Sequence, residues 1–386
     1  MKEVSPIAAS DTRLAIADIA DRDARCHVVH VVEPFSAGIV ESISRILHAL
    51  PPDRFRVTLL HSMRPETPAN YRERLPAHVE TIRWNAAREI NPAADLRALA
   101  ELWRHLRTLQ PNVVHAHSSK AGVLARLACR LLGYRCIYSP RAFSFLRLDV
   151  PARKRRLYRT IERFGARLGA VTVGASQSEL ELARELGGRS RLIRNMIDVD
   201  SVRDAVDRHR ASASTRFTTG ISGRLSPQKN VPLFMRIAGL CPEIDFVWIG
   251  GDAAELDATE VPPNVRFTGW LPRERVLGEV AGLDALVQTS LWEGLPISVL
   301  EAMALEKPVV AFPAVGNRDV VEDGANGFLC SDAEEFADRL RQLAGDAELR
   351  RTMGAKSLEI LRRDYNSAIN AGQWRDLYLE IAGREA

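Results

Sequence analysis

The sequence predicts two α/β domains, each built on a parallel β-sheet with helices on both faces. Two observations lead to this fold class. The chain has 386 residues, 46% of them hydrophobic, which is enough for two separate buried cores. Short β-branched runs alternate with helical segments along most of the chain, and a polar stretch near residue 200 interrupts the alternation once.

The first domain is expected over residues 26–198. Its predicted strands are HVVHVV at 27–32, RVTLL at 56–60, NVVHA at 112–116, CIYS at 136–139 and VTVGA at 171–175. Residues 1–25 are predicted to form a mobile tail, because their apolar residues follow no long periodic pattern.

The second domain is expected over residues 216–365. Its predicted strands are FTTGIS at 217–222, DFVWIG at 245–250, VRFTG at 265–269, DALVQ at 284–288 and PVVAF at 308–312. Residues 199–215 are charged and rich in Ser and Ala, which favours an interdomain linker. Residues 366–386 carry an apolar helical stripe and are expected to pack back toward the first domain; the stripe comprises Trp374, Leu377, Tyr378 and Ile381.

Charge and cysteine content narrow the function classes. Lys and Arg number 53 against 49 Asp and Glu, a net charge of +4 that argues against wholesale nucleic-acid binding. The five cysteines lack the C-x-x-C spacing of zinc or redox sites, so reduced thiols in the cytoplasm are expected. Neither a secretory signal nor an apolar run of membrane-spanning length is predicted, so any membrane role would be peripheral.

The most informative segment is TSLWEGLPISVLEAMALEKP. Glu293 lies at the end of a predicted loop, and Glu301 lies eight residues later inside a predicted helix with Pro296 in its first turn. Free backbone N–H groups at such a helix start attract an anion, and the two carboxylates suit sugar and ribose hydroxyls. Taken alone, the two glutamates would fit solvated surface charges better than a binding site, and the surrounding sequence reverses this interpretation.

A second segment, GRLSPQKN at 223–230, follows the first predicted strand of the second domain. It places Arg224 and Lys229 on a loop at the carboxyl end of the sheet, where the helix start of the previous segment also lies. Arg binds phosphate through paired hydrogen bonds and Lys as a compact charge, so together they suit a diphosphate.

These segments, together with GANGFL at 324–329, resemble the family 4 retaining glycosyltransferases, which have the GT-B fold of two Rossmann-like domains facing a central cleft. The resemblance runs from about residue 27 to 385. It implies that the first domain binds the acceptor and the second binds a nucleotide-sugar donor, with a UDP- or GDP-sugar as co-substrate and neither cofactor nor metal. The implied reaction is retaining transfer of a hexose-type sugar.

The resemblance also implies roles for individual residues. Arg224 and Lys229 would hold the donor diphosphate, and Glu301 the ribose. Glu293 would hold the donor sugar with the backbone of Gly294, Leu295, Pro296 and Ile297, and FTGWLP at 267–272 would lie beside the base. Gly38 and His117 match the family's glycine loop and sugar-contacting histidine, so the predicted catalytic group is Glu293, His117, Arg224 and Lys229.

His117 ends the strand NVVHAH, in which His115 and His117 share one face because side chains alternate along a strand. His117 is nearer the expected cleft, and a histidine held in a loop network is the alternative. Asp198-Val199-Asp200 matches a metal-binding D-x-D pattern but falls at the domain connection, so we interpret it as coincidental.

Four positions depart from the family pattern. Ala37-Gly38 replaces Gly-Gly, SPRAF at 139–143 replaces a His-Gly pair, Asn195-Met196 replaces Asn-Gly, and Gly316-Asn317-Arg318-Asp319 replaces G-G-x-x-E. The second departure puts Arg141 in the expected acceptor-facing loop, which weakens inference of the acceptor from relatives.

Residues 141–167 contain nine basic residues against two acidic ones, and Leu157, Ile161, Phe164 and Leu168 follow helical spacing. This pattern indicates either a basic amphipathic helix that lies on an anionic membrane, or an ordinary helix packed on the sheet with a solvated basic face. The membrane-side or acceptor-side candidates are Arg141, Phe143, Arg153, Lys154, Arg155 and Arg156. The expected acceptor is a polyprenyl-diphosphate-linked saccharide in surface polysaccharide biosynthesis.

Other classes of function remain as alternatives. A non-catalytic protein that binds nucleotide-sugar or docks on a membrane would share the fold. An epimerase or a phosphorylase would share it too, but the spacing of Glu293 and Glu301 together with the GRLSPQK segment argues against both. A dinucleotide-dependent enzyme is disfavoured, because no G-x-G-x-x-G follows either first strand.

Overall fold

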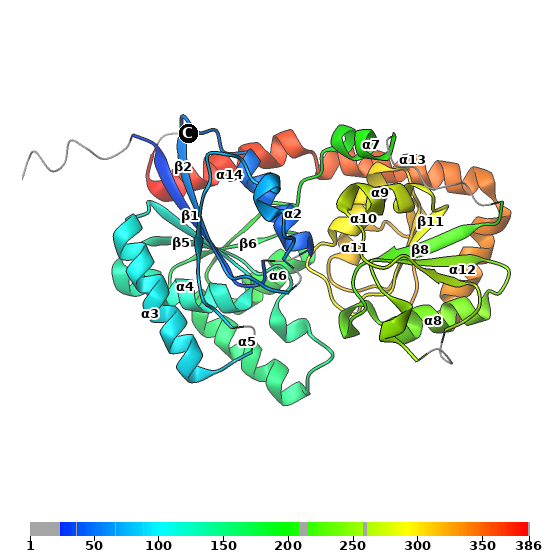
Figure 1. Ribbon diagram of the computed structural model, residues 1–386, viewed down its shortest axis with the longest axis horizontal. Coiled ribbons are helices and arrows are strands. Elements are labelled where there is room, and N and C mark those ends of the chain that lie inside the picture. The colour runs from blue at the N-terminus through cyan, green and yellow to red at the C-terminus, as the bar shows by residue number, and fades with distance from the viewer. Residues whose placement is uncertain are drawn as a thin grey trace, which may run out of the picture.

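The computed structural model describes residues 24–35, 37–65, 67–87, 89–207, 215–257 and 261–384. Two α/β domains lie side by side in it (Figure 1). Residues 1–23, most of the predicted tail, lie outside the described part.

The first domain contains a seven-stranded parallel sheet. Its strands are, in spatial order, β3 (Glu80–Arg83), β2 (Phe55–His61), β1 (Cys26–Val32), β4 (Val113–His117), β5 (Arg135–Ser139), β6 (Val171–Gly174) and β7 (Arg189–Leu192). The central strands β1 and β4 are buried along their whole length, as expected where helices cover both faces. These helices are α2 (Ala37–His48), α3 (Pro92–Leu109), α4 (Ser119–Leu132), α5 (Ala152–Ala166) and α6 (Gln177–Leu186), with short 3₁₀ turns η1 (Tyr71–Arg74) and η2 (Ser144–Leu146).

The second domain contains a six-stranded parallel sheet. In spatial order its strands are β10 (Val265–Phe267), β9 (Asp245–Ile249), β8 (Thr218–Ser222), β11 (Ala285–Gln288), β12 (Val309–Ala311) and β13 (Gly327–Leu329). Its helices are α8 (Val231–Leu240), α9 (Arg273–Ala281), α10 (Ile297–Ala304), α11 (Asn317–Val320), α12 (Ala333–Gly345) and α13 (Ala347–Asp364), with η3 (Pro227–Lys229) and η4 (Ala253–Glu255). Both sheets reverse their strand order beside the first strand, which is where doubly wound folds bind ligands.

The segment predicted as a linker begins with a helix. Helix α7 (Val199–Asp207) packs on α9 and α10 of the second domain, and its Val202, Ala205 and Val206 are buried there (Figure 1). The sequence analysis missed this helix because its apolar residues are few and small. Residues 208–214 lie outside the described part.

The last helix, α14 (Ser367–Ala382), crosses from the second domain to the first, where it packs against β1 and β4 (Figure 1). Trp374, Leu377, Tyr378 and Ile381, the residues of the predicted stripe, are all buried in the core of the first domain. The C-terminal end of the chain therefore completes the domain with which the chain begins.

Loops at the carboxyl ends of the two sheets meet between the domains. Asn195 donates its side-chain amide to the carbonyl of Leu295 (3.1 Å), and the backbone N–H of Ser178 donates to Asp319 (3.0 Å). A Cβ atom added to Gly294 would lie 2.6 Å from the backbone nitrogen of Ala142, so glycine permits this contact between the domains.

Candidate active site

Two loops of the second domain are fastened together at its carboxyl edge. The backbone N–H of Leu291 donates to the carbonyl of Gln228 (2.9 Å), the Gln228 side chain donates to the carbonyl of Trp292 (2.8 Å), and the Thr289 hydroxyl donates to the carbonyl of Lys229 (2.5 Å). These bonds hold the β8–α8 loop, which carries Arg224 and Lys229, against the loop that leads into α10.

The fastening brings Lys229 and Glu293 into contact. Nζ of Lys229 lies 3.0 Å from Oε1 of Glu293, and the two side chains are only 14% and 11% exposed. Gly223, at φ 149°, makes room for this pair, because a Cβ atom there would lie 2.7 Å from Cε of Lys229. Two residues that are 64 positions apart, and that the sequence analysis assigned to diphosphate and sugar, thus lie at one point.

Helix α10 begins directly after this pair. Pro296 is its N-cap rather than its first residue, and the carbonyl of Pro296 accepts from the N–H of Val299 (3.2 Å). The sequence predicted free backbone N–H groups from Leu295 to Val299. The N–H of Val299 is bonded within the helix, so it is not one of them. Arg224 is half-buried on the neighbouring loop.

Glu301 lies in a charge cluster that sequence reasoning missed; its other members are Arg273, Arg45, Glu41 and Arg74. Oε1 of Glu301 lies 2.8 Å from the guanidinium of Arg273 on α9 and 3.4 Å from that of Arg45 on α2. Arg273 also pairs with Glu41 of α2 (3.1 Å), so the cluster joins the two domains. The signal available in the sequence was the Glu41–Arg45 spacing of four on one helix, which is common on solvated surfaces and was therefore uninformative.

Burial and charge act in opposite directions within this cluster. Loss of solvent lowers the pKa of Arg45, although Glu301 partly opposes it. Burial also acts to lower the pKa of Arg273, but the carboxylates of Glu301 and Glu41 raise it above its ordinary value. Both guanidiniums therefore stay charged, and the ribose-binding role predicted for Glu301 would have to be performed beside them.

His117 is fully buried and has protein partners at both ring nitrogens. Its Nδ1 lies 3.4 Å from the guanidinium of Arg141, and its Nε2 lies 3.0 Å from Nδ1 of His30. Burial lowers the pKa of His117 far below its ordinary value and that of His30 to about 3. Neighbouring charged groups are the second cause in both cases. Both rings are therefore neutral.

The hydrogen-bond chain fixes the tautomers of these rings. A guanidinium can only donate, so Nδ1 of His117 accepts, and its Nε2–H donates to Nδ1 of His30. The proton of His30 is then on Nε2, an atom that is buried without a partner. Contact between His117 and a donor sugar would require one of these bonds to be exchanged, and that role stays a prediction.

His30, His115 and His117 also form the one group of possible metal ligands found in the described residues, with ligand atoms within 4.8 Å of one another. His115 is held by the hydroxyls of Tyr378 (2.7 Å) and Ser139 (2.9 Å). If Nε2 of His117 bound a metal while Nδ1 accepted from Arg141, that ring would have to be an imidazolate. The donor set therefore fits a hydrogen-bonded histidine chain better than a metal site.

Arg141 turns inward instead of facing an acceptor. Its guanidinium donates to the side chains of Asn195 (2.8 Å) and Ser42 (2.5 Å), in addition to His117. Arg141 and Ala142 both have positive φ angles, 56° and 76°, a costly conformation outside glycine. The carboxylate of Glu179 supports this backbone by accepting from the N–H of Ala142 (2.9 Å).

Phe143 has to be removed from the membrane-side group. Its ring is 1% exposed and stacks on Phe145, itself 8% exposed, in the core of the first domain. Aromatic residues after a basic loop were interpreted as a surface feature, but here they cover the sheet. Gly38, in contrast, is exposed, with no atom within 4 Å of the position of a Cβ atom.

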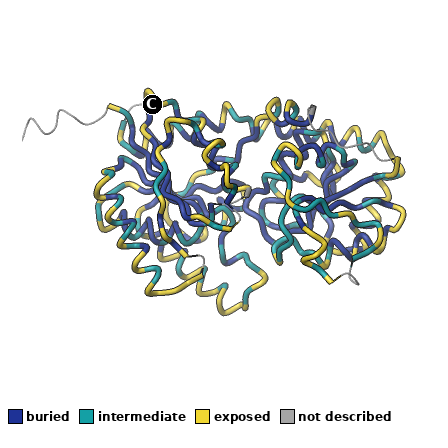
Figure 2. The backbone as a smooth tube through the Cα atoms, viewed as in Figure 1, coloured by how far each residue is buried: buried dark blue, intermediate teal, exposed yellow. Residues whose placement is uncertain are grey.

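Helix α5 carries its polar anchor inside and apolar residues outside. Glu162 is buried between Arg126 (2.7 Å) and the hydroxyl of Tyr138 (2.8 Å). Leu157 and Phe164 of the predicted stripe are 53% and 60% exposed. Figure 2 shows exposed backbone along this helix at the edge of the first domain. Arg153, Lys154 and Arg156 are exposed, and Arg155 is half-buried. Within the described residues, no helix has the length and hydropathy to cross a membrane.

Comparisons with known families agree with this arrangement. Residues 37–195 match the family described as glycosyl transferase 4-like domain, and residues 216–346 match glycosyl transferases group 1. Among curated proteins, the chain is 26% identical over 322 residues to UDP-Gal:alpha-D-GlcNAc-diphosphoundecaprenol alpha-1,3-galactosyltransferase of Escherichia coli, covering 76% of this chain and 82% of that one. It is also 26% identical over 310 residues to the putative glycosyltransferase EpsD of Bacillus subtilis, with 74% and 80% covered.

Solved structures share the fold. Sucrose-phosphate synthase from Thermosynechococcus elongatus superposes with a TM-score of 0.78 at 16% identity, over 93% of this chain and all of that one. HepE of Anabaena, solved with UDP and glucose, gives 0.71 at 19% identity, over 92% and 100%. The fold and the paired loops thus define a glycosyltransferase with the GT-B architecture. More specifically, the chain belongs to the group 1 glycosyltransferases, family 4, as the sequence motifs predicted.

Proposed function

We propose that this enzyme transfers a hexose-type sugar, with retention of anomeric configuration and without a metal, from a nucleoside-diphosphate sugar to a saccharide carried on polyprenyl diphosphate. The observation that carries the proposal is the contact between Lys229 and Glu293 at the start of α10. The relatives add direction, because one is named for a UDP-galactose donor and a diphosphoundecaprenol-linked acceptor, and another was solved with UDP and glucose. Surface polysaccharide assembly is the corresponding pathway class.

The leaving group is stabilised by positive charge. Lys229 and Arg224 neutralise the diphosphate as the glycosidic bond breaks, and the amides at the start of α10 add a fixed partial charge. Together they supply the charge that a divalent metal supplies in other transferases. Without a donor, Lys229 is paired with Glu293, so the arriving diphosphate takes over the ammonium group and leaves Glu293 free to accept from sugar hydroxyls.

Retention is proposed to follow from attack on the face from which the diphosphate departs. The leaving phosphate oxygen takes the proton of the acceptor hydroxyl, and the sugar passes through an oxocarbenium-like state. Closure of the two domains holds donor and acceptor together and excludes water, and positioning of this kind supplies roughly 7 to 11 kcal/mol in well-oriented systems.

Helix α5 is proposed to lie on an anionic membrane surface, where a lipid-linked acceptor would be found. Leu157 and Phe164 share its outer face with Arg153 and Arg156, and no carboxylate of the helix lies there, because Glu162 is buried. An apolar strip flanked by basic residues is typical of helices that lie in the membrane interface. The interpretation as an ordinary packed helix stays the alternative, because Ile161 and Leu168 of the predicted stripe are half-buried and α5 packs on α4.

The first test is calorimetric titration of the purified protein with UDP and with GDP, each with a chelator and then with magnesium. Selective binding of one nucleotide, undiminished by the chelator, is the expected result. Binding of neither nucleotide would favour a non-catalytic protein. Proton NMR of the product anomer then tests retention, and an inverted anomer would contradict the mechanism.

A further inference from the structure

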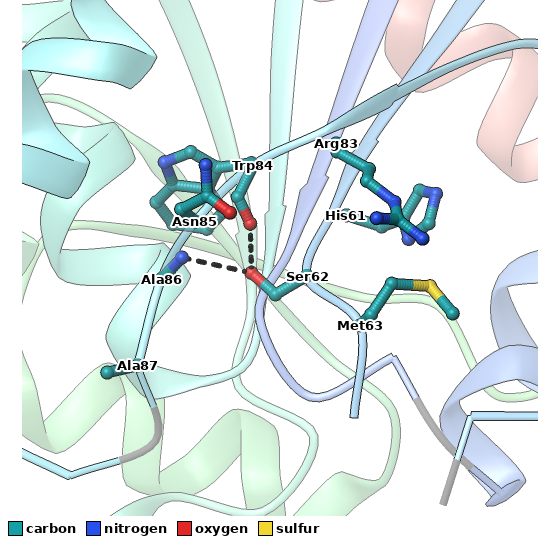
Figure 3. A pocket seen from close by; sticks show the side chains of 8 residues that line it. All are labelled: His61, Ser62, Met63, Arg83, Trp84, Asn85, Ala86 and Ala87. Carbon is teal, nitrogen blue, oxygen red and sulfur yellow. Dashed lines mark hydrogen bonds between the residues drawn. The ribbon is translucent and has the colours of Figure 1, made fainter. Parts of the chain in front are cut away.

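A cavity of about 310 Å³ opens in the first domain at the carboxyl ends of β2 and β3, away from the donor loops of the second domain (Figure 3). Its walls are residues 61–63, which end β2, and residues 83–87, which end β3. Ser62 joins the two walls, because its hydroxyl donates to the carbonyl of Trp84 (2.6 Å) and accepts from the N–H of Ala86 (3.2 Å). The cavity is therefore built by hydrogen bonds between the two segments that line it.

His61 gives this cavity a buried ring nitrogen without a partner. The residue is 1% exposed, and its ring is held between Phe35 and Tyr71, with centroids 4.9 Å from each. Its Nε2 lies 3.2 Å from the hydroxyl of Tyr71, whereas its Nδ1 is buried without a partner. If the Tyr71 hydroxyl donates to Nε2, the ring proton is on Nδ1, and a buried N–H without an acceptor calls for a ligand or an ordered water.

Two exposed arginines lie near the same histidine: Arg83, which lines the cavity, and Arg72, which does not. Burial first, and then Arg72 and Arg83, lower the pKa of His61 to about 4, so the ring is neutral at physiological pH. Figure 3 shows Arg83 and His61 on one side of the cavity, with Met63 below them. No carboxylate is among the lining residues, and neither arginine forms an ion pair within the part of the chain that the structure describes. Glu101 stays outside, where it accepts from Asn85 (3.2 Å).

The chain that follows the cavity wall contacts α4, the helix that comes after His117. Lys120, in the first turn of α4 and three residues after His117, donates to the carbonyl of Glu89 and to the carboxylate of Asp95 (2.8 Å). The segment after residue 87 is thus tied to the helix that follows His117.

From this geometry we infer that the cavity binds an oxyanion, with Arg83 and Arg72 supplying charge and His61 donating from Nδ1, and that its occupant during transfer is the phosphate of the acceptor. The assignment to the acceptor rests on the proposed function, whereas binding of the oxyanion does not. These residues lie outside the motifs quoted in the sequence analysis, although they fall within residues 37–195, which match the family model.

The test is titration of the full chain with inorganic phosphate and with inorganic diphosphate while saturating UDP occupies the donor site. Binding that survives UDP and weakens at least tenfold in Arg72→Ala/Arg83→Ala is expected. Arg107→Ala removes an exposed arginine in the last turn of α3. It is the matched control and should bind phosphate like the wild type. Equal affinity in the double variant and the control would overturn the inference.

A second pair of variants tests the donor atom. His61→Asn keeps an N–H near the position of Nδ1 and should retain phosphate binding, whereas His61→Leu should lose it. UDP affinity and the urea midpoint of each variant show whether it has folded. Loss of binding in both variants, with folding and UDP affinity intact, would contradict donation from Nδ1.

A short prenyl diphosphate distinguishes the source of the anion. If it binds at least tenfold more tightly than inorganic diphosphate, and with the same dependence on Arg83, the cavity recognises a lipid-linked phosphate. Equal affinities would overturn the assignment to the acceptor. Failure of UDP to bind at all would count against the proposed donor site and leave the oxyanion result unaffected.

Discussion

At the scale of single residues, Lys229 is the most direct test of the donor site. Lys229→Ala should lower nucleotide affinity by roughly 10- to 100-fold, because a charge-assisted hydrogen bond to phosphate contributes about 1.5–3 kcal/mol. Arg224→Ala should have a similar effect. Calorimetry with the selected nucleotide measures both variants, and Lys356→Ala, a half-buried lysine of α13 that pairs with Glu359, is the control. Unchanged affinity with an unchanged unfolding midpoint would remove these residues from the site.

The buried histidines predict a dependence of stability on pH. The pKa is about 3 for His30 in the folded protein and about 6.5 in the unfolded chain, so the unfolded state binds more protons as pH falls below 6.5. The free energy of unfolding should therefore decrease from pH 7 to pH 5, by about 2 kcal/mol from His30 alone. Urea unfolding at both pH values measures this. His30→Asn should reduce the decrease, whereas His78→Gln, an exposed histidine, should leave it unchanged.

The candidate residues show what a single sequence can and cannot predict. Lys229 and Glu293 were predicted because each belongs to a local motif with a definite spacing. Arg45, Arg273 and Asn195 were missed, because their partners lie on distant segments and nothing local distinguishes them from surface residues. Arg141 was assigned to the correct loop, but the direction of its side chain depends on two positive φ angles that composition does not predict.

At the scale of elements, helix α5 carries the membrane prediction. Neutralising Arg153, Lys154, Arg155 and Arg156 together should reduce sedimentation with anionic vesicles and spare donor hydrolysis, because each basic residue contributes about 1 kcal/mol near such a surface. Leu157→Ser/Phe164→Ser should weaken binding as well. Leu131→Ser on α4, where the leucine is 61% exposed, is the matched control. Vesicle binding that persists in the first variant would contradict the role of α5.

The ten predicted strands all exist in the structure, and their ends agree to within about two residues. Runs of β-branched residues made this possible, because the strands are buried on both faces. The strands that escaped prediction are β3, β7 and β13. All three are edge strands; β3 and β7 consist mostly of polar residues, and β13 has only three residues, so none of them shows a long apolar run.

At the scale of the whole molecule, the charge cluster around Glu301 couples the two domains. Arg45→Ala changes only the first domain, yet it should lower nucleotide affinity in the second, by about 1 kcal/mol or roughly fivefold, because Arg45 helps to orient Glu301. Calorimetry of Arg45→Ala, Glu301→Gln and the double variant measures the coupling. Arg54→Ala, an exposed arginine that precedes β2 in the same domain, is the control. If the effects of the two substitutions on nucleotide affinity are additive, Arg45 does not act through Glu301, and the coupling between the domains is contradicted.

Helix α14 bears on the order in which the protein can fold during synthesis. Domains usually fold as they leave the ribosome, the first before the second. Here Trp374 and Tyr378 belong to the core of the first domain, and Tyr378 is the partner of His115. The first domain therefore has to wait, with part of its core uncovered, until α14 has been translated. A chain whose synthesis stops within α14 would have a complete second domain and an incomplete first one.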